Sequence, residues 1–149
     1  MKSGAWAAAL ALMAAATIWA GEGWLTDFDK AKEEAAKTKR PILADFSGSD
    51  WCRWCIKLDA EVFSQKAFQE YAKDNLVLFL ADFPRNKALP ETLKAQNETL
   101  MRTYGIRGFP TVLLLDSEGK VIDKTGYRAG GAAGYVEHVK QLLQKKETK

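Results

Sequence analysis

Residues 41–63 read PILADFSGSDWCRWCIKLDAEVF, and this stretch determines the fold that we expect. Its first part, PILADF, is short and mostly apolar, which is typical of a buried strand. The residues SGSD then form a turn, and Asp50 is expected to cap a helix that begins at the two cysteines. Along that helix Cys55, Leu58 and Val62 follow helical spacing. A strand that leads through a short turn into a helix predicts a β–α unit of an α/β domain.

The sequence on both sides continues this alternation of helices and strands. The apolar run NLVLFLAD at residues 75–82 is typical of a central strand covered on both faces. TVLLLD, the turn SEGK and VIDKTG predict a hairpin. Further helices are expected near residues 26–37, 64–72, 91–105 and 132–144, and a very short first strand at residues 24–25. The order predicts a three-layer α/β domain, in which the two strands joined through the cysteine helix are parallel with a right-handed crossover.

The bulk composition is that of an ordinary globular domain. The chain has 149 residues, of which 47% are apolar and 28% charged, and this length suits one domain rather than two. Its 22 Lys and Arg against 19 Asp and Glu give a net charge of +3. Because that balance is only weakly basic, we expect neither nucleic acid nor an anionic membrane surface as partner.

The first twenty residues, MKSGAWAAALALMAAATIWA, differ from the rest of the chain. Lys2 provides a positive start, and the uncharged run at residues 5–20 is shorter than the about 20 residues of a membrane-spanning helix. That combination is typical of an export signal. We therefore expect a signal at residues 1–20, a domain at residues 21–149 and a periplasmic or otherwise exported location, with an uncleaved anchor as the alternative.

Both cysteines of the chain, Cys52 and Cys55, lie at the start of the expected helix. A disulfide between them would close almost no loop, so it would stabilise the fold very little. Unpaired backbone N–H groups at the start of a helix favour a thiolate at Cys52, and Arg53 adds positive charge. Cys55 is close enough to attack a mixed disulfide on Cys52. The spacing predicts dithiol chemistry, with Cys52 as nucleophile and Cys55 as resolving thiol.

Other uses of two cysteines fit the sequence less well. Haem attachment requires a histidine directly after the second cysteine, where Ile56 stands. A zinc site requires about four ligands, and His138, on the last expected helix, is the single histidine of the chain. A zinc site shared between two copies and a pair of inert buried cysteines remain open. We expect no metal and no organic cofactor, because the electrons are held in the disulfide itself.

Together with YGIRGFPTVLLLDSEGK at residues 104–120, residues 41–63 resemble the thioredoxin superfamily. More narrowly, they resemble the exported bacterial thioredoxin-like proteins that share a D-W-C-x-W-C motif. The resemblance covers roughly residue 24 to the end of the chain. It implies a three-layer α/β/α thioredoxin-like fold, with a central mixed sheet of four or five strands flanked by helices, and thiol–disulfide exchange on protein substrates.

The resemblance also implies roles for residues away from the cysteines. Pro110 falls where thioredoxins hold a cis-proline, which would turn the backbone N–H and C=O groups of Phe109 toward an extended substrate. Asp45 falls where thioredoxin-like reductases keep a buried carboxylate that accepts a proton from the second cysteine. The alternatives are a trans-proline that starts an edge strand and an ordinary polar position on a half-exposed strand.

Two tryptophans flank the nucleophile. Trp51 matches the family tryptophan that shields the site and contacts substrates. Arg53 and Trp54 form the dipeptide between the cysteines, which tunes the redox potential in the family. Trp54 is either an apolar contact for substrates or a residue that only packs on the helix. Residues 82–97 form a longer connection than in a minimal thioredoxin, and we expect a spacer there rather than a partner surface.

We expect an exported, monomeric reductase of protein disulfides. Asp45 and the absence of histidine between the cysteines favour this direction. In an oxidising compartment such a reductase requires a redox partner protein, and a membrane-borne electron donor is the expected one. The alternatives are a disulfide oxidase or isomerase, or a non-enzymatic chaperone module or copper carrier, because thiolates bind Cu(I).

Overall fold

The computed structural model describes residues 23–147, and the expected export signal at residues 1–20 lies outside them. Helices and strands alternate in the predicted order, and the very short first strand is present. The elements are β1 (Trp24–Leu25), α1 (Phe28–Thr38), β2 (Ile42–Ser47), α2 (Arg53–Leu58), the π-helix η1 (Asp59–Phe63), α3 (Lys66–Asn75), β3 (Val77–Asp82), α4 (Glu91–Thr103), β4 (Thr111–Leu115), β5 (Val121–Thr125) and α5 (Gly131–Glu147).

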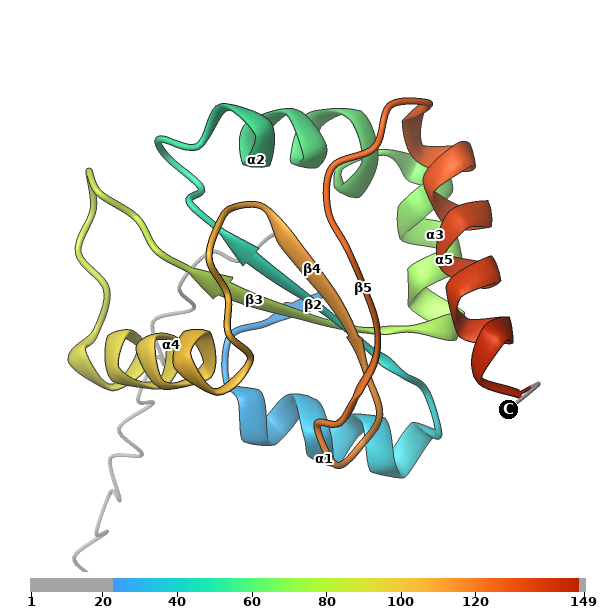
Figure 1. The fold of residues 1–149 in the computed structure, drawn as a ribbon, viewed down its shortest axis with the longest axis horizontal. Coiled ribbons are helices and arrows are strands. Elements are labelled where there is room, and N and C mark those ends of the chain that lie inside the picture. The colour runs from blue at the N-terminus through green and yellow to red at the C-terminus, as the bar shows by residue number, and fades with distance from the viewer. Residues whose placement is uncertain (1–22, 148–149) are drawn as a thin grey trace, which may run out of the picture.

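The strands form one mixed sheet in the order β1-β3-β2-β4-β5 (Figure 1). The strands β2 and β3, which α2 and α3 connect, are parallel as predicted. The strand β4 runs antiparallel to β2 and pairs with β5 in the predicted hairpin. This arrangement places β2 in the centre of the sheet, hydrogen-bonded to a neighbour on each side.

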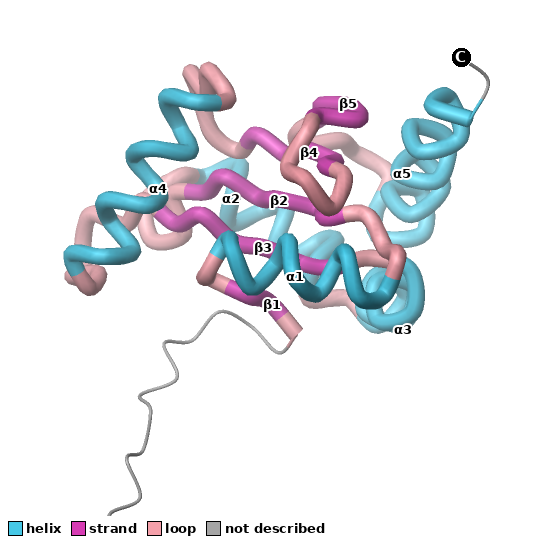
Figure 2. The backbone as a smooth tube through the Cα atoms, turned by 90° about the horizontal axis from the view of Figure 1, so that it is seen from below, coloured by secondary structure: helices cyan, strands magenta, loops and turns pink. Residues whose placement is uncertain are grey.

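Helices cover both faces of the sheet and complete the three-layer α/β/α thioredoxin-like fold (Figures 1 and 2). On one face, α2, η1, α3 and α5 pack on inward side chains such as Leu43 and Leu114. On the other face, α1 and α4 pack on Ile42, Ala44 and their neighbours. All six residues of β2 are buried. Among the described residues, no helix is both long enough and apolar enough to cross a bilayer.

Leu58 attaches α2 to the sheet, and its truncation tests how much this packing stabilises the protein. The side chain is fully buried, so Leu58→Ala leaves a cavity and should lower the free energy of unfolding by about 2–5 kcal/mol. Ile56 of the same helix is 48% exposed, and Ile56→Ala should cost less than about 1 kcal/mol. Urea titrations of the two variants compare them directly. If the two variants lost the same free energy of unfolding, the packing of α2 on the sheet would not depend on Leu58.

Candidate active site

The two cysteines form a disulfide at the carboxyl end of the central strand. Cys52 is the N-cap of α2, and its Sγ accepts the backbone N–H of Cys55 at 3.2 Å. The backbone N–H of Gly48 donates to Cys55 Sγ at 3.5 Å. The cysteines are 7% and 4% exposed. The expectation that Asp50 caps this helix is therefore wrong, because the chain enters the helix at Cys52.

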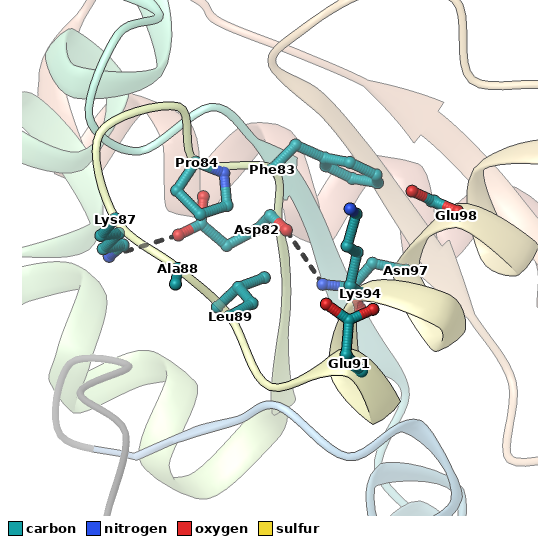
Figure 3. A pocket seen from close by; sticks show the side chains of 10 residues that line it. All are labelled: Asp82, Phe83, Pro84, Lys87, Ala88, Leu89, Glu91, Lys94, Asn97 and Glu98. Carbon is teal, nitrogen blue, oxygen red and sulfur yellow. Dashed lines mark hydrogen bonds and ion pairs between the residues drawn. The ribbon is translucent and has the colours of Figure 1, made fainter.

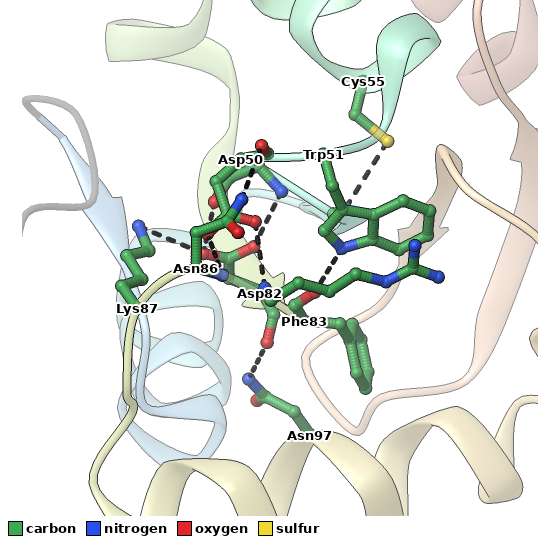
Figure 4. A network of polar contacts seen from close by, with 11 residues as sticks. Asp50, Trp51, Cys55, Asp82, Phe83, Asn86, Lys87 and Asn97 are labelled. Carbon is green, nitrogen blue, oxygen red and sulfur yellow. Dashed lines mark hydrogen bonds and ion pairs between the residues drawn. The ribbon is translucent and has the colours of Figure 1, made fainter.

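Asp50 instead holds the connection between β3 and α4 against the cysteine turn (Figure 4). Its carboxylate accepts the backbone N–H of Arg85 at 2.9 Å and that of Asn86 at 2.8 Å. These hydrogen bonds, led by the one from Arg85, lower the pKa of Asp50. The Asn86 amide donates back to the carbonyl of Asp50 at 3.3 Å. The start of the segment 82–97 is thus attached to the cysteine turn, and its use as a spacer rather than a partner surface stays a prediction.

Asp82, the last residue of β3, makes a second link between the same two segments. It accepts the backbone N–H and the hydroxyl of Ser49 at 3.0 and 2.6 Å, and Lys87 forms an ion pair with it at 3.4 Å. Its carbonyl accepts the side chain of Asn97 at 2.9 Å. Figure 3 shows Asp82, Lys87 and Asn97 at a pocket beside this link, between the connection and α4.

Trp51 lies where the cysteine turn, this connection and the proline loop meet. Its indole N–H donates to the carbonyl of Phe83 at 2.8 Å (Figure 4). The guanidinium of Arg85 lies 3.6 Å from the centre of the indole. Gly48 makes room for the indole, since a Cβ there would meet the ring at 2.5 Å. Trp51 therefore has a fixed position directly before the disulfide.

The proline loop adjoins this tryptophan. The Phe109–Pro110 peptide bond is cis, which confirms the expected geometry. The ring of Phe109 packs edge-on against Trp51, with 5.9 Å between centroids, and lies 5.0 Å from Phe83. Phe109 and Pro110 are half-buried. The structure thus brings Phe109 to Trp51 although the two lie far apart in the sequence.

Trp54 lies on the other side of Cys52 in the sequence and is 48% exposed. Its ring centre lies 5.0 Å from that of Tyr127, a residue of the β5–α5 connection. The cation of Lys57 lies 5.1 Å from the Trp54 centre, and that of Arg53 lies 5.9 Å from it. Trp54 therefore packs on Tyr127 and is still half exposed, and its contact with substrates stays a prediction.

Asp45 lies in the middle of β2, on the face that the cysteine helix covers. It is 6% exposed, so the alternative of a half-exposed polar position is wrong. With Cys55 and Asp59 it lines a cavity of about 160 Å³, which is large enough for water molecules. Within residues 23–147 its Oδ1 has no hydrogen-bond partner.

This environment makes Asp45 a weak acid. Burial, followed by the negative charges of Asp59 and Asp82, raises the pKa of Asp45 to about 8. A carboxyl group with that pKa is mostly protonated at neutral pH and can both donate and accept a proton near it. The carboxyl group of Asp45 and Cys55 line the same cavity, which is the arrangement that proton transfer between them requires.

Several residues of this arrangement were not among those that the sequence pointed to. Asp59 lies within residues 41–63, Asp82 and Arg85 lie in the segment 82–97, and Tyr127 follows the hairpin, but none of the four belongs to a motif. The unusual length of the segment 82–97 was the one feature of the sequence that could have drawn attention to Arg85. Among residues 23–147, no cluster of three or more His, Cys, Asp or Glu side chains is arranged to hold a metal ion.

A disulfide with this spacing, at the start of a helix, next to a tryptophan that contacts the cis-proline loop and in one cavity with a buried acid, is typical of thiol–disulfide oxidoreductases. The chain belongs to the thioredoxin-like domain family, whose model matches residues 28–139.

Relatives with assigned names agree with this class. The chain is 35% identical to the disulfide bond reductase DsbH of Chlamydia pneumoniae over 117 residues, which is 78% of this chain and 70% of DsbH. A solved structure of a DsbH oxidoreductase is 33% identical, with a TM-score of 0.78 and 95% of each chain covered. The thiol:disulfide interchange protein DsbD of Yersinia enterocolitica is 27% identical over 79% of this chain, but the chain spans only 19% of DsbD.

The pKa of Asp45 predicts how the stability of the oxidised protein depends on pH. The native state keeps the proton up to a pH of about 8, whereas an unburied aspartate loses it near 3.8. Between these values the unfolded state binds fewer protons, so the free energy of unfolding should fall as pH rises, by about 1.4 kcal/mol per pH unit. Asp45→Asn should remove that slope.

Urea titrations of both proteins between about pH 5 and pH 8 measure the difference, since other titrating groups contribute equally to the two profiles. The variant should gain stability over the natural protein as pH rises. Parallel profiles would mean that Asp45 is ionised in the folded protein.

Proposed function

We propose that the protein reduces disulfide bonds of other proteins in an exported compartment. The observation that carries this proposal is the buried, protonatable Asp45 in the same cavity as Cys55. Reduction of a substrate leaves the Cys55 thiol with a proton to lose as it attacks, and a base with a pKa near neutrality suits that step. The name of the relative DsbH, a disulfide bond reductase, supports the same direction.

In this reaction the Cys52 thiolate attacks one sulfur of the substrate disulfide and releases the other as a thiolate, which takes a proton from solvent. A mixed disulfide then joins Cys52 to the substrate. Cys55 gives its proton to the ionised form of Asp45, which is the minority form at neutral pH, and attacks the Cys52 sulfur. The second substrate sulfur leaves as a thiolate and takes a proton from solvent. Two electrons have passed to the substrate, and the protein holds the Cys52–Cys55 disulfide.

The residues around the disulfide bind the substrate chain in this proposal. The loop at Phe109 and Pro110 offers its backbone N–H and C=O groups to an extended segment. Trp51 and Trp54 provide apolar contact on the two sides of Cys52, and Arg53 lies beside Trp54.

Each turnover requires a dithiol donor that reduces the Cys52–Cys55 disulfide again. We propose that the donor is a membrane-borne redox protein, that the substrates are disulfide-bonded proteins and that the chain acts as a monomer outside the cytoplasm. The relatives named DsbH and DsbD support exchange with other proteins of disulfide metabolism.

Replacement of the resolving thiol tests the order of attack. Reduced Cys55→Ser protein should form mixed disulfides through Cys52 with disulfide-bonded substrate proteins, because nothing displaces the substrate. Non-reducing gel electrophoresis should show most of the variant in adducts that dithiothreitol releases. Cys52→Ser is the matched control and should form at least about tenfold fewer adducts, because Cys52 is the N-cap and the start of the helix stabilises its thiolate. Equal trapping by both variants would contradict the assigned roles.

The redox potential of the Cys52–Cys55 pair tests the direction of electron flow. A reductase should equilibrate near the value of thioredoxin, about −270 mV, in a series of dithiothreitol buffers. A value near about −120 mV, as for a strongly oxidising periplasmic protein, would instead indicate a disulfide oxidase. The absence of any reversible transition would remove the redox assignment and favour a copper carrier or a chaperone module.

A further inference from the structure

Positive charges lie on the aromatic rings on both sides of the disulfide. Arg85 lies 3.6 Å from the centre of the Trp51 ring. On the other side, Lys57 lies 5.1 Å from the Trp54 centre and 5.4 Å from that of Tyr127. Arg53, the residue that follows Cys52, lies 5.9 Å from the Trp54 centre. We call these three aromatic residues and three basic residues the cationic rim.

The carboxylates next to the cationic rim already have partners. Asp50 accepts two backbone N–H groups of the β3–α4 connection, and Asp82 accepts two hydrogen bonds from Ser49 and an ion pair from Lys87. Glu61 accepts the Tyr127 hydroxyl at 2.7 Å and has Lys57 at 3.7 Å. The negative charge on this side of the molecule is thus engaged within the protein.

The two arginines of the rim have no such partners. Arg53 and Arg85 are exposed, and neither forms an ion pair with a carboxylate within residues 23–147. A guanidinium that lies on an aromatic ring is held in place while the N–H donors at its edge stay available to a carboxylate. The geometry leaves one arginine on each side of Cys52 that can bind an incoming anion.

We propose that the cationic rim selects polypeptide segments that carry Asp or Glu on both sides of their reacting cysteine. This inference rests on the proposed function, because it names the substrate class of the same disulfide. Arg85 pairs with a carboxylate on the Trp51 side, and Arg53 pairs with one on the Trp54 side. The attraction raises the rate of encounter before the Cys52 thiolate attacks, and the two electrons then pass to the substrate disulfide as described above.

Three synthetic peptides test the inference. Each contains one intramolecular disulfide, and the residues flanking its cysteines are aspartate, serine or lysine. The reduced protein is mixed with each peptide, quenched by alkylation at intervals and analysed by mass spectrometry. The second-order rate constant for the acidic peptide should exceed that for the basic peptide by at least about tenfold at low salt. The ratio should fall below about threefold in 0.5 M salt, because salt screens exposed charges.

Variants of the two arginines test whether these side chains cause the preference for the acidic peptide. Arg53→Gln and Arg85→Gln should each lower the ratio of the acidic to the basic rate constant, and the double variant should bring it near one. Arg102→Gln is the matched control, since it removes the same charge from the last turn of α4, on the opposite face of the sheet from α2. It should keep the ratio of the natural protein. Circular dichroism verifies that each variant is folded.

The outcomes separate this inference from the proposed function. Reduction of all three peptides at equal rates would overturn the inference and leave the proposed function standing. Reduction of none would overturn both. If Arg102→Gln lowered the ratio of the acidic to the basic rate constant as much as the double variant, the preference would come from the net charge of the protein. That result too would overturn a role for the cationic rim.

Discussion

The burial of β2 on both faces and along both edges is the constraint on which the rest of the site depends. A strand held by two neighbouring strands and covered by two helix layers cannot shift its register without exposing its apolar residues. Its last residue, Ser47, therefore has a fixed position, and so has the turn that leads to Cys52. The same constraint places Asp45 beneath the cysteine helix, where its carboxyl group is buried.

The disulfide lies between two environments of opposite character. On the inner side, Asp45 occupies a low-dielectric cavity that favours its neutral form, so the exchange of a proton there is possible near neutral pH. On the outer side, basic side chains lie on aromatic rings and remain in contact with solvent. Cys55 shares the inner cavity with Asp45, and Cys52 lies between Trp51 and Trp54 in the sequence.

Much of the fold follows from local sequence patterns, and so does the cysteine pair. The apolar runs identify β2, β3 and β4, because burial imposes short continuous apolar stretches on such strands, and the turn SEGK identifies β5 as the hairpin partner of β4. The contacts of Asp50 and Tyr127 do not follow in this way. Asp50 meets Arg85 across 35 positions, and Tyr127 meets Glu61 across 66. A contact between residues so far apart leaves no local pattern in the sequence. Asp50 was therefore expected to cap a helix, and the attachment of the segment 82–97 to the cysteine turn was not expected.

The β3–α4 connection is attached to the cysteine turn largely through main-chain atoms. Asp50 accepts from the backbone N–H groups of residues 85 and 86, and Trp51 donates to the backbone carbonyl of Phe83. Any residue except proline supplies the N–H groups, and every residue supplies a carbonyl. The side chain at position 85 can therefore change while the loop keeps its path. A substitution there alters the surface beside Trp51 and leaves the strand, the turn and the disulfide as they are.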